Sequence, residues 1–290
     1  MKAMLADRGL TLLSLLTVFK GRIALTWALT LGEAALTALV PLFIGFAIDG
    51  LLGETPRALW HLAGLLAALV ALGVTRRLYD TRAYGTIRVE LGKAQAARSA
   101  ALPVSALNAR LDMGRELVDF LEDTLPSAMA AGVQFAVSIT VLFAFAQQLA
   151  LAALAAAFGM AAVYALFHRR FFRLNGQLNQ QTERQVGVLE KRAQGSTLAH
   201  LRRLRRFEVQ LSDAEAILYG AVFALLLALI LFNLWFAAAM MTVTAGAVFS
   251  IVAYSWDFAE ASLSLPVTLQ TWSRLSEITA RLNRAPGRAS

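Results

Sequence analysis

Residues 201–236 read LRRLRRFEVQLSDAEAILYGAVFALLLALILFNLWF, and this stretch decides the fold class. Its second part, 217–236, contains no Asp, Glu, Lys or Arg. At about 1.5 Å per helical residue, that part is long enough to cross the hydrocarbon core of a bilayer. Its first part, 201–207, has leucines three apart with arginines between them, which is typical of an amphipathic helix. The stretch therefore predicts one helix that crosses a membrane and continues into water on the arginine side.

The rest of the chain has the same character. Its 290 residues are 58% hydrophobic and only 16% charged, which is too apolar for an ordinary soluble domain of this length. Backbone amides have no water partners in hydrocarbon, so we expect helices that satisfy their own hydrogen bonds. The sequence predicts an all-α membrane protein with six transmembrane helices, at residues 23–48, 58–79, 126–146, 148–168, 215–236 and 245–272.

The basic residues predict the orientation of these helices. All of the 27 Lys and Arg residues except Arg57 lie before the first span, at or within the long connections around 80–125 and 169–214, or at the end of the chain. Since basic residues favour the cytoplasmic side, we expect both termini and both long connections there, in a bacterial-type inner membrane. Topology and contact with anionic lipid account for the net charge of +8, so we expect membrane lipid and no nucleic acid as a partner.

The spans are joined by very unequal connections. The two cytoplasmic connections, about 80–125 and 169–214, are rich in helix formers and predict long helical hairpins that continue the spans. We expect the first hairpin to turn at Pro103 and residues 108–114, and Gly195 to open the tip of the second. The predicted organisation is an amphipathic elbow and N-terminus (1–22), a six-span domain (23–272) and a cytoplasmic tail (273–290).

Three carboxylates lie at similar depth within predicted spans. Glu33 is in the first span, and Asp257 and Glu260 are three residues apart in the sixth, on neighbouring parts of one helical face. Charged groups inside a membrane are costly and usually face a wet cavity or a partner. Because no Lys or Arg lies deep within a span, we expect these acids to be uncompensated, and to bind a cationic solute or relay protons.

Neighbouring residues leave other interpretations open. The acids could instead be held by polar side chains across helices, for instance Gln134, Ser255 or Ser262. Tyr254, Trp256 and Phe258 interleave the acids and would suit a cationic solute through ring contacts, but aromatic residues in a span also serve simply as packing, which we favour for Phe258. We therefore include Tyr254, Trp256 and Gln134 in the candidate pathway.

The sequence offers little for catalysis. It contains no cysteine, and its three histidines have no H-x-x-x-H spacing. We therefore expect no catalytic residue and no metal site, and the chain is not predicted to be an enzyme.

Several short stretches resemble the transmembrane domain of ABC exporters. Val40–Asp49, VPLFIGFAID, is similar to the P-x-x-x-G-x-x-I-D segment that closes the first span of that family. Ala101–Pro103, Met113–Leu117 and Asp123 resemble its first cytoplasmic hairpin. Trp272–Ile278 resembles the stretch that joins its sixth span to the nucleotide-binding domain. The resemblance extends over nearly the whole chain, and it rests on the order and spacing of these motifs.

The resemblance implies a homodimer that exchanges helices around a central cavity, which opens alternately to each side. The chain differs from the family pattern at Asp119, where the family usually has Arg. It has no G-x-x-x-x-G-K-[ST] loop and no L-S-G-G-Q signature, so we expect a stand-alone transmembrane domain. The chain itself is expected to bind no cofactor, and ATP would act through a partner ATPase subunit.

In that family, short coupling helices at the hairpin tips sit in grooves of the ATPase. The arginine-rich run 201–207 can be interpreted as this docking element, or as a segment that contacts anionic headgroups or fixes topology. The resemblance implies these candidates for coupling to an ATPase: Ala106, Leu107, Asn108, His200, Leu201, Arg202 and Arg203.

Together these observations predict a transporter permease subunit that moves a solute by alternating access and is energised by a separately encoded ATPase. One alternative is an ATP-independent, proton-driven transporter of peptide-like or cationic solutes. A second alternative is a non-transporting membrane scaffold or receptor.

Overall fold

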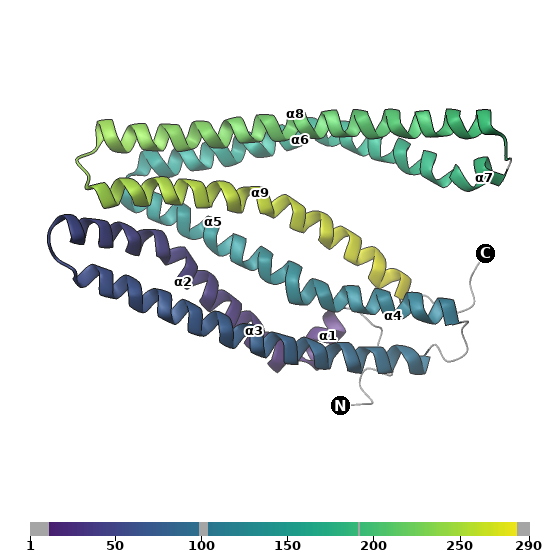
Figure 1. Ribbon diagram of the computed structural model, residues 1–290, viewed down its shortest axis with the longest axis horizontal. Helices are drawn as coiled ribbons and strands as arrows, with labels where there is room; N and C mark the ends of the chain where they lie inside the picture. The colour runs from purple at the N-terminus through teal and green to yellow at the C-terminus, as the bar shows by residue number, and fades with distance from the viewer. Residues whose placement is uncertain (1–11, 99–103, 191, 283–290) are drawn as a thin grey trace. The chain divides into compact units, whose positions relative to one another are not determined.

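A computed structural model describes residues 12–98, 104–190 and 192–282, and within these ranges the chain is helical with short connections and no strand (Figure 1). The all-α expectation is confirmed. The helices are α1 (Leu12–Val18), α2 (Lys20–Leu52), α3 (Arg57–Arg98), α4 (Val104–Asp119), the π-helix η1 (Phe120–Thr124), α5 (Leu125–Phe145), α6 (Gln147–Glu183), α7 (Gln185–Glu190), α8 (Gln194–Met240) and α9 (Ala245–Leu282).

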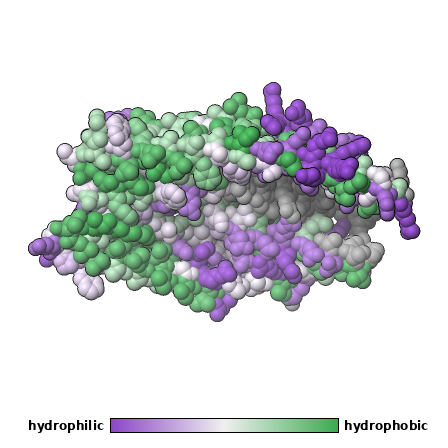
Figure 2. Space-filling view, turned by 45° about the horizontal axis from the view of Figure 1, so that its top comes forward, coloured by the Kyte–Doolittle hydropathy of each residue, from purple (hydrophilic) through white to green (hydrophobic). Residues whose placement is uncertain are grey.

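Within the described ranges, five helical segments are long and apolar enough to cross a membrane, and they correspond to the first five predicted spans. The sixth predicted span lies in α9. Figure 2 shows hydrophobic side chains over one part of the long helices and hydrophilic side chains over the other. Helices α3, α6 and α8 each continue from apolar into polar sequence without a break. The five segments are Lys20–Leu52, Arg57–Ala97, Arg110–Phe145, Gln147–Glu190 and Gln194–Met240.

The chain divides into two compact units. Unit 1 is Met1–Ala144 with Met241–Ser290, and unit 2 is Phe145–Met240. In unit 1, we call the end with residues 53–56 and 241–244 the loop end, and the opposite end, where α3 finishes, the hairpin end.

The apolar core of unit 1 lies at its hairpin end. Leu15 and Phe19, from the predicted elbow, are buried there with Ile23 at the start of α2. They pack into one cluster with Tyr84 of α3 and Leu121 of η1. The described part of the elbow therefore buries one face against the first hairpin.

At the loop end of unit 1, α2 and α9 approach closely enough for backbone contact. A Cβ atom on Gly45 or Gly246 would collide with the backbone of the other helix, so these positions need glycine. The hydroxyl of Ser250 donates to the carbonyl of Pro41 at 3.1 Å. Asp49 accepts hydrogen bonds from the Thr244 hydroxyl and, at 2.8 Å, from the Gly246 backbone N–H. Asp49 thereby satisfies an N–H at the start of α9 that has no partner within the helix.

Unit 2 is a helical hairpin. Helices α6 and α8 run side by side, and the short helix α7 lies at the tip (Figure 1). Their buried residues are mostly small or branched and apolar, such as Ala153 on α6 and Leu226 on α8. One polar contact crosses the polar part of the hairpin, where Gln181 Nε2 lies 2.8 Å from His200 Nδ1.

Two expectations about the hairpins were wrong. Residues 108–114 do not form a turn, because they lie inside α4; Pro103, the other expected turn residue, lies outside the described residues. The run 201–207 is not a separate tip element, because it lies inside α8. Its helix formers continue that helix without a break, and the short helix at the tip is α7.

Candidate functional site

Unit 1 contains a cleft of about 810 Å³, bounded by α2, α3, η1, α5 and α9. This volume lies within the range of pockets that hold small molecules, roughly 300–1,000 Å³. The apolar part of its wall comes from alanine, leucine, valine and proline side chains. The charged and amide side chains in its wall are Glu33, Arg76, Arg77, Asp80, Glu122, Asp123, Gln134, Asp257 and Glu260.

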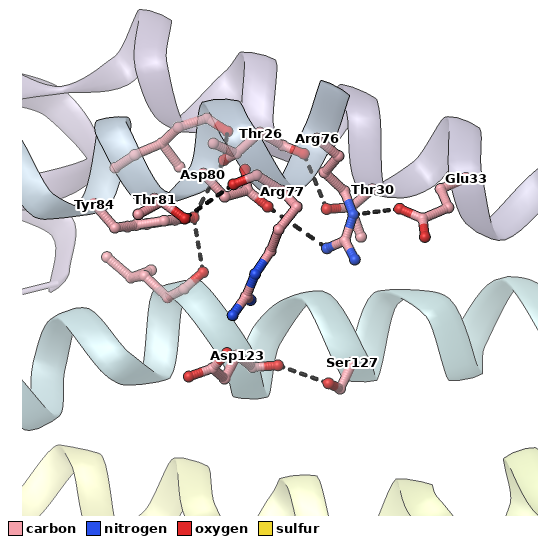
Figure 3. Close-up of polar contacts among 12 residues, drawn as sticks. Thr26, Thr30, Glu33, Arg76, Arg77, Asp80, Thr81, Tyr84, Asp123 and Ser127 are labelled. Carbon is pink, nitrogen blue, oxygen red and sulfur yellow. Dashed lines mark hydrogen bonds and ion pairs between the residues drawn. The ribbon is translucent and has the colours of Figure 1, made fainter. Parts of the chain in front are cut away.

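Glu33 is not an uncompensated acid, which corrects the prediction from the sequence. Its carboxylate forms an ion pair with the guanidinium of Arg76 on α3 (Figure 3). The residue facing it on α3 is Gly73, and a Cβ atom there would lie 3.3 Å from the carboxylate. Glu33 therefore packs closely on α3. The prediction failed because Arg76 was assigned to the cytoplasmic end of the second span, out of reach of Glu33.

The pairing has a signal in the sequence that was missed. Residues 33 and 76 lie about equally far along the chain from the turn at 53–56. In an antiparallel helical hairpin, such residues lie at the same level. Counting outward from this turn would have placed Arg76 beside Glu33.

Arg76 also links Glu33 to a second acid of the cleft that the sequence analysis did not single out. Its Nη1 lies 3.6 Å from Oδ2 of Asp80, one helical turn further along α3. The Asp80 side chain is only 8% exposed, and its Oδ1 has no hydrogen-bond partner within the described residues. Figure 3 shows Arg77, also in the cleft wall, extending its guanidinium from α3 toward the helix that carries Asp123, which lies in η1.

The acids of α9 have a different environment. The amide of Gln134 on α5 donates a hydrogen bond to Oδ2 of Asp257, so the structure joins two of the predicted pathway residues. Glu260 lines the same cleft and is exposed. Neither acid forms an ion pair with a basic side chain in the described part of the chain. The alternative that polar side chains hold these acids is thus seen for Asp257 and Gln134.

Tyr254, Trp256 and Phe258 of α9 do not line the cleft wall. Tyr254 is fully buried, and its hydroxyl donates to the carbonyl of Ala38 on α2 at 2.7 Å. Trp256 is 59% exposed and lies outside the cleft wall. Phe258 is buried against Phe135 of α5, with ring centroids 5.0 Å apart. In unit 1 these rings serve helix packing or the outer surface.

A second charged cluster lies where the first hairpin meets the cleft. Arg88 on α3 donates to Asp119 at 2.5 Å and forms an ion pair with Glu122 of η1 at 2.5 Å. Asp119, which occupies a position where the resembling family usually has Arg, is therefore matched by an arginine from the facing helix. These two contacts hold the end of α4 and η1 against α3 at the edge of the cleft.

The candidate coupling residues are spread over different environments. Leu107 is half-buried and Asn108 is exposed, with its amide donating to Asp112 at 3.1 Å, while the side chain of Ala106 lies outside the described set. His200 is buried in unit 2 against Gln181. Leu201, Arg202 and Arg203 are exposed on α8.

Across the described residues, no group of three or more His, Asp or Glu side chains is arranged to hold a metal ion. The cleft instead offers a partly buried ion pair, and two carboxylates that have no basic partner among the described residues. Such an arrangement can bind a positively charged group or exchange protons, since a carboxylate removed from bulk water is stabilised by either.

Long apolar helices that continue into polar hairpins, together with the charged cleft of unit 1, define a multi-pass membrane domain of the transporter type. The chain matches the family model of the ABC transporter transmembrane region over residues 12–246, and it belongs to that family. No nucleotide-binding domain is matched in this sequence. No curated protein matches the chain. Membership of this family suggests a function in membrane transport.

Proposed function

We propose that the chain is the solute-translocating part of an ABC-type transporter of the inner membrane, with its hairpins in the cytoplasm. It works as a homodimer by alternating access. The observation that carries the proposal is the cleft of unit 1, which places charged side chains among helices long enough to span a membrane. Such groups are costly in lipid unless they serve a wet pathway.

The contacts at the loop end support one of the two states that alternating access requires. Gly45, Asp49 and Gly246 hold α2 against α9 beyond the cleft, while the cleft wall extends to Asp80 and Asp123 toward the hairpin end. This arrangement fits a pathway that is closed at the loop end. With the orientation expected from the basic residues, that end faces away from the cytoplasm.

ATP hydrolysis drives the cycle, in ATPase domains that are not part of residues 1–290. The tip helix α7 is the better candidate for contact with them than residues 201–207, because it is the short helix at the tip. Its Val186 and Leu189 are 66% and 51% exposed, and exposed apolar residues on a hairpin that reaches into water are candidates for a protein contact.

The test is affinity purification of the tagged protein from its native membranes, followed by an ATPase assay and mass spectrometry. We expect ATPase activity in the sample, and we expect Val186→Asp with Leu189→Asp to abolish it. Val209→Asp, an exposed residue of α8 away from the tip, is the matched control and retains activity. A pure homodimer without ATPase activity would contradict the proposal.

Proton-driven transport is the second candidate function. The specific observation in its favour is that Asp257 and Glu260 have no basic partner within the described residues. In vesicles without ATP, an imposed pH gradient would then drive solute movement, and Asp257→Asn with Glu260→Gln would stop it.

A further inference from the structure

Some acids of the cleft are paired with an arginine, and others have no such partner among the described residues. This contrast indicates what kind of solute the cleft suits. Between α2 and α3, Glu33 is paired with Arg76, and nearer the hairpin end Glu122 is paired with Arg88. Asp257 and Glu260, on α9, line the cleft and form no such pair with any described residue. Gln134 donates one hydrogen bond to Asp257, which orients the carboxylate without neutralising it.

Asp80 gives a second and independent indication of excess negative charge. Its side chain is more than nine-tenths buried in the wall of the cleft, yet Oδ1 has no hydrogen-bond partner in the described part of the chain. The nearest cation, on Arg76, is already engaged by Glu33. A carboxylate oxygen in this situation lowers the free energy of any positive charge that enters the cleft.

A large part of the remaining wall is apolar, and these apolar side chains face the same volume as the acids. Apolar surface in a binding cleft favours a ligand that has apolar surface of its own. The residues that provide it include Ala34, Val40, Pro41, Leu66, Leu69 and Ala130.

We propose that the cleft binds an amphipathic organic cation, with the charged group between Asp257 and Glu260 and the apolar part against α2 and α3. This inference rests on the proposed function, because it names the class of solute for that same cleft. An anionic solute is disfavoured, since Arg76 is paired and Arg77 is flanked by Asp80 and faces Asp123 (Figure 3).

The experiment measures binding alone, with no energy source, so its result does not depend on the transport mechanism. The protein is placed in nanodiscs of zwitterionic lipid, and equilibrium dialysis measures the binding of ethidium, an aromatic cation, after subtraction of empty nanodiscs. Phenanthridine, the uncharged parent ring, is the matched ligand control. We expect ethidium to bind at least about tenfold more tightly than phenanthridine, because only ethidium carries the charge.

The variants locate the charge. Asp257→Asn and Glu260→Gln should each weaken ethidium binding about tenfold, and Asp257→Glu should retain most of it because the charge remains. Glu54→Gln, which removes an exposed acid at the loop end, is the matched control and should change nothing. Thermal unfolding of each variant shows whether it is folded. Because Glu260 is exposed to solvent, Glu260→Gln is the variant that should disturb folding least.

Equal binding of ethidium and phenanthridine would overturn the inference. Unchanged ethidium affinity in the folded Asp257→Asn and Glu260→Gln variants would also overturn it. If those variants lost transport but kept ethidium affinity, the acids would be proton carriers, and the second candidate function would stand without the proposed solute. Ethidium binding without ATPase activity in the purified sample would leave the inference intact and contradict only ATP-driven transport.

Discussion

The two units of the molecule solve the same problem, the packing of long apolar helices, in different ways. Unit 2 pairs α6 and α8 through small and branched apolar residues along most of their length. Unit 1 ties its helices together with polar contacts between helices, at Glu33 with Arg76, Gln134 with Asp257, and Asp49 with the start of α9. Polar contacts between helices in a membrane are worth only about 1 kcal/mol each. Unit 1 therefore has contacts that are specific and yet weak enough to be exchanged.

The largest expected effect comes from the glycine contact of unit 1. A Cβ atom at Gly246 would collide with the backbone of Gly45 and with the Asp49 carboxylate, so Gly246→Ala should lower the free energy of unfolding by about 3 kcal/mol. Thermal unfolding in detergent measures this. Gly220→Ala on α8 of unit 2 is the control, since nothing lies within 4 Å of the added methyl, and it should stabilise by about 0.5–1 kcal/mol. Equal effects at both positions would remove this difference between the units.

The cap that Asp49 provides for α9 should have the next largest effect. Asp49→Ala removes the acceptor for the Thr244 hydroxyl and the Gly246 N–H, and should cost about 2 kcal/mol of stability. Asp49→Asn keeps one oxygen acceptor and should lose less. Chemical denaturation of the three proteins compares them, and an alanine variant as stable as the asparagine variant would show that the cap contributes nothing.

The ion pair between Glu33 and Arg76 should show a moderate coupling energy. Both side chains are about one-quarter exposed, at 27% and 28%, so water screens part of the interaction. We expect Glu33→Gln and Arg76→Gln to be non-additive by about 1.5 kcal/mol in a double-mutant cycle of unfolding free energies. Strict additivity would mean that the two groups do not stabilise each other, and Glu33 would then count among the uncompensated acids.

The smallest effect is expected at the polar contact of unit 2. Gln181→Leu removes the hydrogen bond to the buried His200 and should cost about 0.5–1 kcal/mol. Gln177→Leu, at an exposed position of the same helix, is the control. If Gln181→Leu cost more than the loss of the Glu33–Arg76 coupling, the polar contacts would matter as much in unit 2 as in unit 1.

Features that depend on local sequence could be predicted. The length of the apolar stretches and the helix formers that follow them were sufficient for the continuous helices α3, α6 and α8. Asp257 and Gln134 were singled out because polar groups in a span need partners, and the structure joins them. The segment around Pro41 and Asp49 was recognised as a motif, and its glycine and acid prove to be the contacts with α9.

Features that depend on the register between helices were not predicted. Arg76 reaches Glu33 because α2 and α3 turn at residues 53–56, which sets the two residues at the same level. The sequence analysis instead assigned Arg76 to the cytoplasmic end of the second span, and so placed it out of reach of Glu33. The tip helix α7 is six residues long, too short to leave a periodic pattern in the sequence. Trp256 was grouped with the acids beside it, although neighbouring residues on a helix point about 100° apart.

The π-helix η1 sets the angular position of the residues of α5 relative to those of α4. A π-helix accommodates one residue more than an α-helix does, so it shifts the angular position of everything that follows it. If Phe120–Thr124 relaxed to α-helical geometry, Gln134 would rotate by roughly 100° about the helix axis relative to Asp119. The amide would turn away from Asp257 while Asp119 stayed on Arg88. One local change of hydrogen-bond pattern would thus rotate the cleft side of this helix relative to its hairpin side, without breaking the helix that joins them.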